Sequence, residues 1–166
     1  MNATEIVQTF ITALQWGDME EAVDWMGDDF VFSGWTPRPL DRGEFLAMHS
    51  TLKDAMPDYS FHLSDVKERD GGVEALIQIT GTQMRDLALP MFGVPNIRYT
   101  GIDVSLPQVH TTFSFEGDKI KEMRVESVPG GGLAGLLQQI GTELPLLPRL
   151  DDSDIQRMNE SGETSI

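Results

Sequence analysis

Cysteine is absent from the 166 residues of the chain. Disulfides, thiolate nucleophiles and cysteine-ligated metals are therefore excluded. Histidine is scarce as well, because only His49, His62 and His110 occur and no two of them have the spacing of an HExxH zinc motif. We therefore expect neither a metal ion nor any other cofactor.

Basic residues are few. Lysine and arginine total 12 against 27 aspartates and glutamates, which leaves a formal net charge of −15. Binding to phosphates requires a basic stripe, and the field of so acidic a protein repels polyanions. The composition thus predicts no binding to nucleic acid or to an anionic membrane surface.

Long apolar runs are also missing, since none approaches the ~20 residues that a membrane-spanning helix needs. The first residues lack the basic region and apolar core of a secretory signal, so we expect a cytoplasmic protein. The length suits one domain. We place that domain at residues 1–143, followed by an extended strap at 144–150 and an acidic, disordered tail at 151–166.

Helical patterns occupy the first third of the chain. Apolar residues recur at three- and four-residue steps within residues 2–17, 18–27 and 41–57, and each stretch opens on an Asn or Asp that has a Glu three positions later. Gly17, Gly27 and Pro57 end these three stretches. The pattern predicts three helices before any long strand.

Alternating patterns follow. Residues 59–63 and 73–79 alternate apolar with polar side chains around Asp70-Gly71-Gly72, which indicates a hairpin. Residues 101–115 and 120–127 are further strands, and Pro107 marks a bulge or an edge in the first of them. A last helix follows the glycine run at 130–132. This order is typical of an α+β fold in which a curved sheet wraps the N-terminal helices and leaves a ligand cavity at one open end.

Five segments together resemble the nuclear-transport-factor-2-like (NTF2-like) superfamily, and specifically its SnoaL-like polyketide cyclase branch, over roughly residues 4–141. They read GDMEEAVDWMGDDFVF, MPDYSF, ALIQITGTQ, DKIKEM and GLLQQIG, in that order. The resemblance implies a cone-shaped, cystatin-like α+β barrel with a deep apolar pocket for a small apolar molecule, and a homodimer. It does not imply one reaction, because isomerases, cyclases, hydratases and non-catalytic binders share this scaffold.

Two positions depart from the cyclase-like pattern. Gln83 stands where that pattern carries a histidine after the glycine-threonine pair of the third strand. Val128 stands where it carries an aspartate near the end of the last strand, and Glu126 is the nearest carboxylate on the same strand face. Loss of both groups would remove the acid and base that aldol chemistry requires.

Three residues are candidates for catalysis. Glu126 is the first choice, because a carboxylate in an apolar cavity has a raised pKa that suits a general acid or base. The alternative is that the Glu126 side chain faces solvent on the outer surface of the sheet and has no catalytic role. Arg124 either holds an anionic group of the substrate or pairs with neighbouring glutamates. Asp103 and His110 form a dyad if a bulge at Pro107 turns both inward, and otherwise lie on the surface.

Candidates for the walls of the ligand-binding pocket are mostly aromatic or apolar. Tyr59 or Gln83 would polarise the ligand. The set is Trp25, Trp35, Phe45, Tyr59, Ile77, Gln83 and Arg124. His49 lies on the third predicted helix beside Met48 and Leu52, and we interpret it as a hydrogen-bonded histidine at a helix edge.

Residues 83–100 mix prolines with large apolar side chains and have no clean period. Such a loop either plugs the cavity of its own domain or packs on a partner. Three hypotheses remain open: an enzyme that uses Glu126 on a carbonyl-bearing apolar substrate, a cavity protein that binds an apolar ligand without turnover, and a structural or regulatory homodimer that docks through this loop.

Overall fold

Capping side chains begin all three N-terminal helices in the computed structural model, which describes residues 1–144, and Asp18 caps the second of them by accepting the N–H of Glu21. Asn2 and Asp41 each accept a backbone N–H three residues on, and Glu5 and Glu44 each accept the N–H of the cap, which completes two capping boxes. The helices are α1 (Ala3–Trp16), α2 (Met19–Asp24) and α3 (Arg42–Ala55), as the sequence pattern predicted.

A six-stranded sheet of order β2-β1-β10-β9-β4-β3 forms the body of the molecule. Its pairs are antiparallel except for β1 and β10, which run parallel. The predicted turn at Asp70-Gly71-Gly72 is confirmed between β3 and β4, and Asp70 and Gly71 have positive φ there. The first strand of the hairpin was predicted at 59–63 and lies instead at Ser64–Arg69. The strands are β1 (Met26–Ser33), β2 (Leu40–Asp41), β3 (Ser64–Arg69), β4 (Gly72–Ile77), β9 (Val109–Glu116) and β10 (Lys119–Val125).

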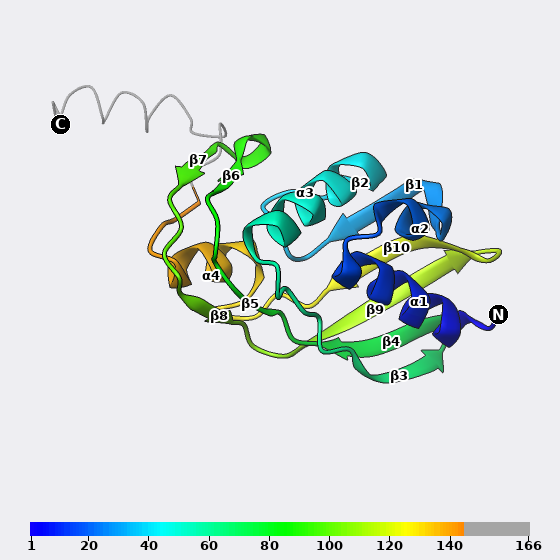
Figure 1. Ribbon diagram of the computed structural model, residues 1–166. Helices are drawn as coiled ribbons and strands as arrows, with labels where there is room; N and C mark the ends of the chain where they lie inside the picture. Colours follow the sequence, from blue (N-terminus) through cyan, green and yellow to red (C-terminus); the bar gives the residue numbers. More distant parts are fainter. Residues whose placement is uncertain (145–166) are drawn as a thin grey trace, which may run out of the picture.

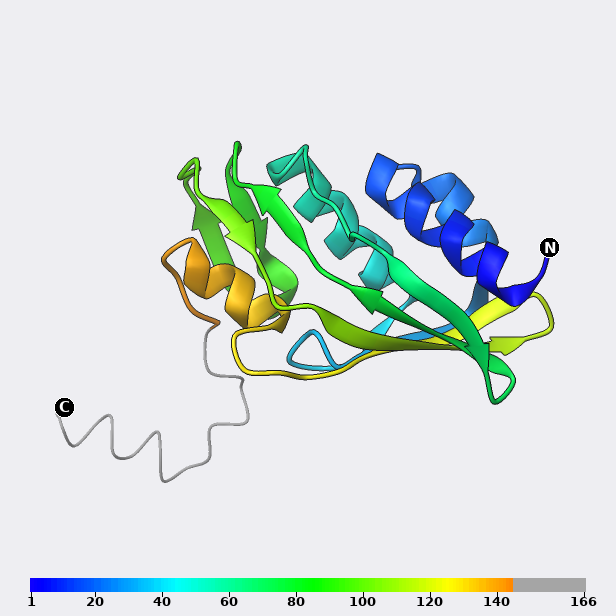
Figure 2. The same cartoon turned by 90° about the horizontal axis from the view of Figure 1, so that it is seen from below.

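The three helices cover one face of this sheet, and the opposite face is bare of helices (Figures 1 and 2). Side chains alternate accordingly on β10, where Met123 and Val125 are buried beneath the helices and Arg124 is exposed. The sheet is curved but remains open, so the cone-shaped α+β fold is confirmed without a closed barrel. Buried aromatic rings from α1, α3 and β1 fill the space between the two layers.

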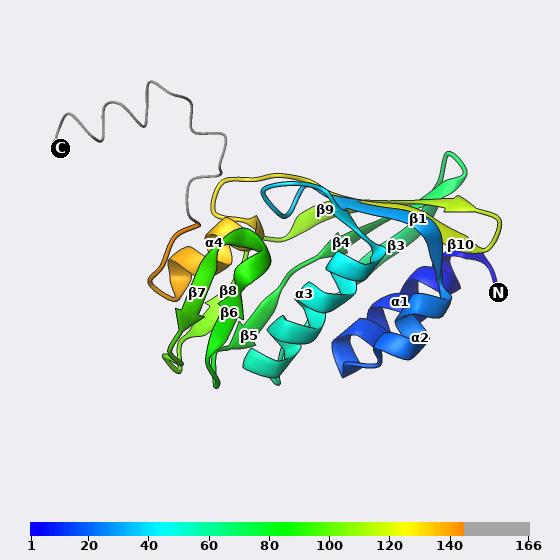
Figure 3. The same cartoon turned by 90° about the horizontal axis from the view of Figure 1, so that it is seen from above.

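Two small sheets and a last helix lie at one end of the main sheet, where β4 ends and β9 begins (Figure 3). The predicted strand over residues 101–115 is divided, because Pro107 has no N–H to continue the ladder. Its first part joins a different sheet. These elements are β5 (Thr80–Thr82) paired with β8 (Asp103–Ser105), β6 (Leu87–Leu89) paired with β7 (Val94–Ile97), the 3-10 helix η1 (Pro90–Phe92) and α4 (Gly132–Gln139).

The 83–100 segment packs on its own domain. Leu87, Leu89, Phe92 and Val94 are all at most 5% exposed, so their side chains are not available to a partner. Its exposed large apolar side chains are Met84 and Tyr99.

Helices in the described part of the chain are all too short or too polar to cross a membrane. Apart from Leu144, the predicted strap at 144–150 and the predicted tail at 151–166 lie outside the described residues.

Candidate functional site

A small cavity lies between α3 and the inner face of the main sheet, and we call it the inner cavity. Its volume is about 20 Å³. Two of its lining side chains, His49 and Tyr59, carry groups that hydrogen-bond strongly, and the rest are apolar or indole. The lining residues are Phe32, Trp35, His49, Tyr59, Phe61, Ile77, Ile79, Val109, Met123 and Val125.

His49 reaches the inner cavity from the buried face of α3. It follows Phe45 by four residues and precedes Leu52 by three, so all three side chains share one helix face. The imidazole centroid lies 4.4 Å from the Phe45 ring and 5.6 Å from the Phe61 ring, and His49 is 4% exposed. The interpretation of a hydrogen-bonded histidine at a helix edge is therefore wrong, because the ring is surrounded by aromatic side chains.

Polar atoms in this cavity have no partner. Within residues 1–144, neither ring nitrogen of His49 nor the hydroxyl of Tyr59 has a hydrogen bond. The hydroxyl of Thr111, which faces the same side of the sheet on β9, is buried without a partner as well. Nearly all buried polar groups in proteins are hydrogen-bonded, so such a group calls for an explanation. Three of these unpartnered atoms, on His49 and Tyr59, belong to the lining of one cavity.

Burial keeps both cavity groups neutral. It lowers the pKa of His49 from 6.5 to about 3, because the imidazolium would lose its hydration among aromatic rings. Burial also raises the pKa of the Tyr59 hydroxyl well above its usual range. Near pH 7 the site therefore offers a neutral imidazole, with one donor and one acceptor nitrogen, beside a neutral phenol.

The predicted catalytic residues lie outside the inner cavity. Glu126 is exposed, and its carboxylate accepts the backbone N–H of His110 at 3.2 Å on the helix-free side of the sheet. His110 is exposed as well. Asp103 is exposed on β8, where Thr82 donates its hydroxyl at 2.7 Å. The structure does not bring these three carboxylate and imidazole groups together around a ligand.

Three of the predicted wall residues, Trp35, Tyr59 and Ile77, line the inner cavity. Phe45 is buried behind His49 and contributes to the core.

The other predicted wall residues lie elsewhere. Trp25 is partly buried and donates its indole N–H to Glu21 at 3.1 Å. Arg124 is exposed and pairs with Glu122 at 3.0 Å. Gln83 is fully buried, but its side chain donates to the carbonyl of Ile97 and accepts from Thr100. Gln83, which stands where the family pattern has a histidine, therefore uses its side chain to hold the loop at residues 97–100.

The helical period could have placed His49 inside, since it lies in the apolar stripe of its helix. The sequence carries no signal that its ring lacks a partner, because that depends on side chains from segments distant in the sequence. No three histidine, aspartate or glutamate side chains within residues 1–144 gather closely enough to hold a metal ion.

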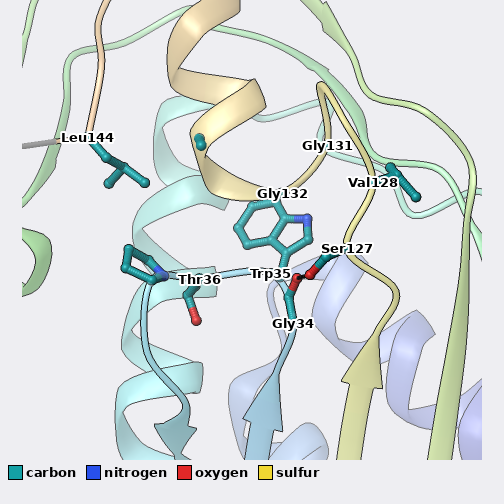
Figure 4. A pocket seen from close by; sticks show the side chains of 10 residues that line it. Gly34, Trp35, Thr36, Ser127, Val128, Gly131, Gly132 and Leu144 are labelled. Carbon is teal, nitrogen blue, oxygen red and sulfur yellow. Dashed lines mark hydrogen bonds between the residues drawn. The ribbon is translucent and has the colours of Figure 1, made fainter.

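A second, open pocket lies beyond Trp35 and is called the outer pocket here. Its volume is about 190 Å³, and Figure 4 shows the Trp35 indole lying between the Gly34 segment and the start of α4. Val128, the position where an aspartate was expected, is part of its wall. The outer pocket is lined by Gly34, Trp35, Thr36, Pro37, Ser127, Val128, Gly131, Gly132, Ala134 and Leu144.

The comparisons agree with the fold. Residues 7–123 match the model of the SnoaL-like domain, and the chain belongs to that NTF2-like family. A search of curated proteins gave no match.

Solved structures resemble the chain at low identity. TsrD from Streptomyces laurentii is 18% identical with a TM-score of 0.63, and the match covers 85% of this chain and 97% of that one. A protein named as a polyketide cyclase from Acidithiobacillus ferrooxidans is 22% identical with a TM-score of 0.60, over 83% and 93%. An NTF2-like protein of unknown function from Cytophaga hutchinsonii is 14% identical with a TM-score of 0.55, over 78% and 92%. These likenesses establish the fold alone.

Proposed function

We propose that this protein binds a small, neutral, largely apolar molecule whose single oxygen forms hydrogen bonds with Tyr59 and His49. The observation that carries the proposal is the set of unpartnered polar atoms on these two buried side chains. A carbonyl oxygen accepts from the phenol, and a hydroxyl can also donate to the imidazole. Apolar walls such as Ile77 and Met123 suit the remainder of the molecule.

The ligand is neutral for a physical reason. A charge transferred into a cavity of aromatic and aliphatic side chains loses its hydration and needs an opposite charge to offset that loss. No acidic or permanently charged side chain is among the ten lining residues, and the pKa of about 3 leaves His49 uncharged. Cations and carboxylates are therefore disfavoured.

Binding without turnover is favoured over acid/base chemistry. A general base works best when its pKa is near the working pH, and burial makes His49 a much weaker base than that. The second candidate function is proton abstraction beside a carbonyl that Tyr59 polarises. It is supported by the neighbouring positions of His49 and Tyr59, whose ring centroids lie 5.9 Å apart.

The test is an NMR titration of isotope-labelled protein with cyclohexanone, with cyclohexylamine as a control of similar shape that is cationic near pH 7. Cyclohexanone is expected to shift signals of residues around Tyr59 and His49, and the cation to shift none of them. Replacement of Tyr59 by Phe should weaken cyclohexanone binding about tenfold, the effect of one buried hydrogen bond. Equal binding of the two compounds, or no effect of Y59F, would contradict the proposal. Native mass spectrometry of freshly purified protein would detect a retained ligand.

A further inference from the structure

The inner cavity is too small for the ligand that its chemistry suits. A volume of about 20 Å³ holds roughly one water molecule, whereas sites for small organic molecules usually have ~300–1,000 Å³. Any larger ligand must displace a lining side chain. The question is which of the ten can move.

Trp35 is the lining residue that the inner cavity shares with the outer pocket. Its indole stacks toward the imidazole of His49 at a centroid distance of 6.5 Å and an interplanar angle of 27°. On the other side it faces the outer pocket (Figure 4). The side chain is 8% exposed, the highest value among the buried apolar residues. One indole thus separates the buried polar groups from the surface.

The backbone at Trp35 is held firmly. Its carbonyl accepts the N–H of Leu133 at 2.8 Å, and a Cβ on Gly132 would lie 2.9 Å from the same oxygen. Gly34 has a φ of +94°, and its carbonyl accepts the hydroxyl of Ser127 at 3.0 Å. Movement at this point is therefore confined to rotation of the Trp35 side chain.

The outer pocket has the volume and the walls to receive an indole. It offers about 190 Å³, and its side chains include Pro37, Val128, Ala134 and Leu144, which are apolar. An indole that rotates into the outer pocket keeps much of its apolar contact, so its rotation out of the inner cavity has a modest free-energy cost. The space that the ring leaves adjoins His49 directly.

We propose that Trp35 is the gate of the binding site. Its indole occupies the place of the ligand and rotates into the outer pocket when the ligand enters. This inference rests on the proposed function, and it defines the ligand class further. The ligand is a compact molecule of one or two fused rings, about the size of the indole, with its oxygen at the inner end beside Tyr59 and His49. Long or branched chains are excluded, because a single indole releases the space.

The experiment uses full-length protein that contains 5-fluorotryptophan, so that the three tryptophans give separate fluorine NMR signals, assigned by single replacements. Cyclohexanone is the probe, and Trp16, which is 77% exposed, is the internal control. On binding, the Trp35 signal should shift and gain sensitivity to exchange of H2O for D2O, while the Trp16 signal stays unchanged.

Affinity measurements on Trp35→Ala and Trp35→Phe complete the test. Without the indole, the ligand no longer needs a minor open state, so W35A should bind cyclohexanone about tenfold or more tightly than the unaltered protein. The affinity of W35F should lie between those of W35A and the unaltered protein. If W35A does not fold, W35F alone provides the test. W16A is the matched control and should bind as the unaltered protein does.

The outcomes separate the two proposals. Binding that depends on Tyr59, with an unchanged Trp35 signal and no gain in W35A or W35F, overturns the gate and leaves the proposed function standing. Tighter binding by W35A that Y59F does not weaken supports the gate and overturns the role of the polar pair. Absence of cyclohexanone binding in every variant overturns both.

Discussion

The imidazole of His49 and the phenol of Tyr59 lie edge to face, with ring centroids 5.9 Å apart, and neither side chain forms a hydrogen bond within residues 1–144. Each buried, unpartnered polar group costs about 1–3 kcal/mol of folding free energy. Two such groups share one wall of a cavity that is otherwise apolar or indole-lined. Their cost is offset when a ligand supplies the missing hydrogen-bond partners.

Replacement of Tyr59 by Phe should separate stability from binding. The change removes a buried hydroxyl without creating a large void, so the free energy of unfolding should stay equal or rise by about 1 kcal/mol. Urea denaturation measures this free energy of unfolding. The affinity of the same variant for cyclohexanone should fall. Tyr99→Phe is the control, since Tyr99 is 60% exposed and should change neither quantity. A large loss of stability in Y59F would show that the hydroxyl has a structural partner.

Acid should destabilise the protein through His49. The folded-state pKa of about 3 lies below the value of 6.5 for an unfolded chain, so the unfolded state binds the proton first as the pH falls. Stability from this residue is complete above pH 6.5 and is lost progressively toward pH 3. Between pH 7 and pH 5 the loss is about 2 kcal/mol.

The measurement compares urea denaturation of the unaltered protein and of His49→Leu at both pH values. The leucine variant should lack this part of the acid loss, because it has no imidazole to protonate. His110→Gln, at an exposed position, should retain it. An identical acid loss in H49L would show that His49 is protonated equally in both states.

The fold could be predicted from the sequence because its signals are local. The capping boxes at Asn2 and Asp41 and the turn at Asp70 and Gly71 depend on residues a few positions apart. Pro107 indicated a bulge or an edge in one long strand because proline lacks a donor, whereas the chain divides there into β8 and β9, and which sheet receives β8 depends on distant partners.

The site was harder to predict for the same reason. Alternation along β10 allowed two assignments of the inner face, and burial of Met123 and Val125 places Glu126 outside. The five rings around His49 include Phe45 of its own helix, but the other four come from segments distant in the sequence, and no spacing reports that they leave the imidazole without a partner. Tyr59, one of the predicted wall residues, lines the inner cavity, and its burial could be expected because a tyrosine amid apolar alternation is rarely exposed.

Replacement of Glu126 by Gln should leave the binding site unchanged. Its carboxylate is exposed and bonds a backbone N–H of the neighbouring strand, which an amide oxygen can also accept. Affinity for cyclohexanone should stay within about twofold, and the free energy of unfolding within ~0.5 kcal/mol, as is usual at surface positions. Titration and urea denaturation check the two values. A tenfold loss of affinity would instead support the hypothesis of Glu126 as a site residue.

The close approach of Gly34 to β10 should make this glycine irreplaceable. A Cβ at Gly34 would lie 1.8 Å from the carbonyl oxygen of Val125, and the φ of +94° is itself strained for any other residue. Gly34→Ala should therefore lower the free energy of unfolding by more than about 2 kcal/mol and also disturb the adjoining Trp35.

Gly71→Ala is the matched control. Its φ is +81° but nothing lies within 4 Å of the added Cβ, so it should lose only the backbone strain of about 1 kcal/mol. Equal losses in the two variants would show that φ, and not the contact with Val125, determines the requirement for glycine at position 34.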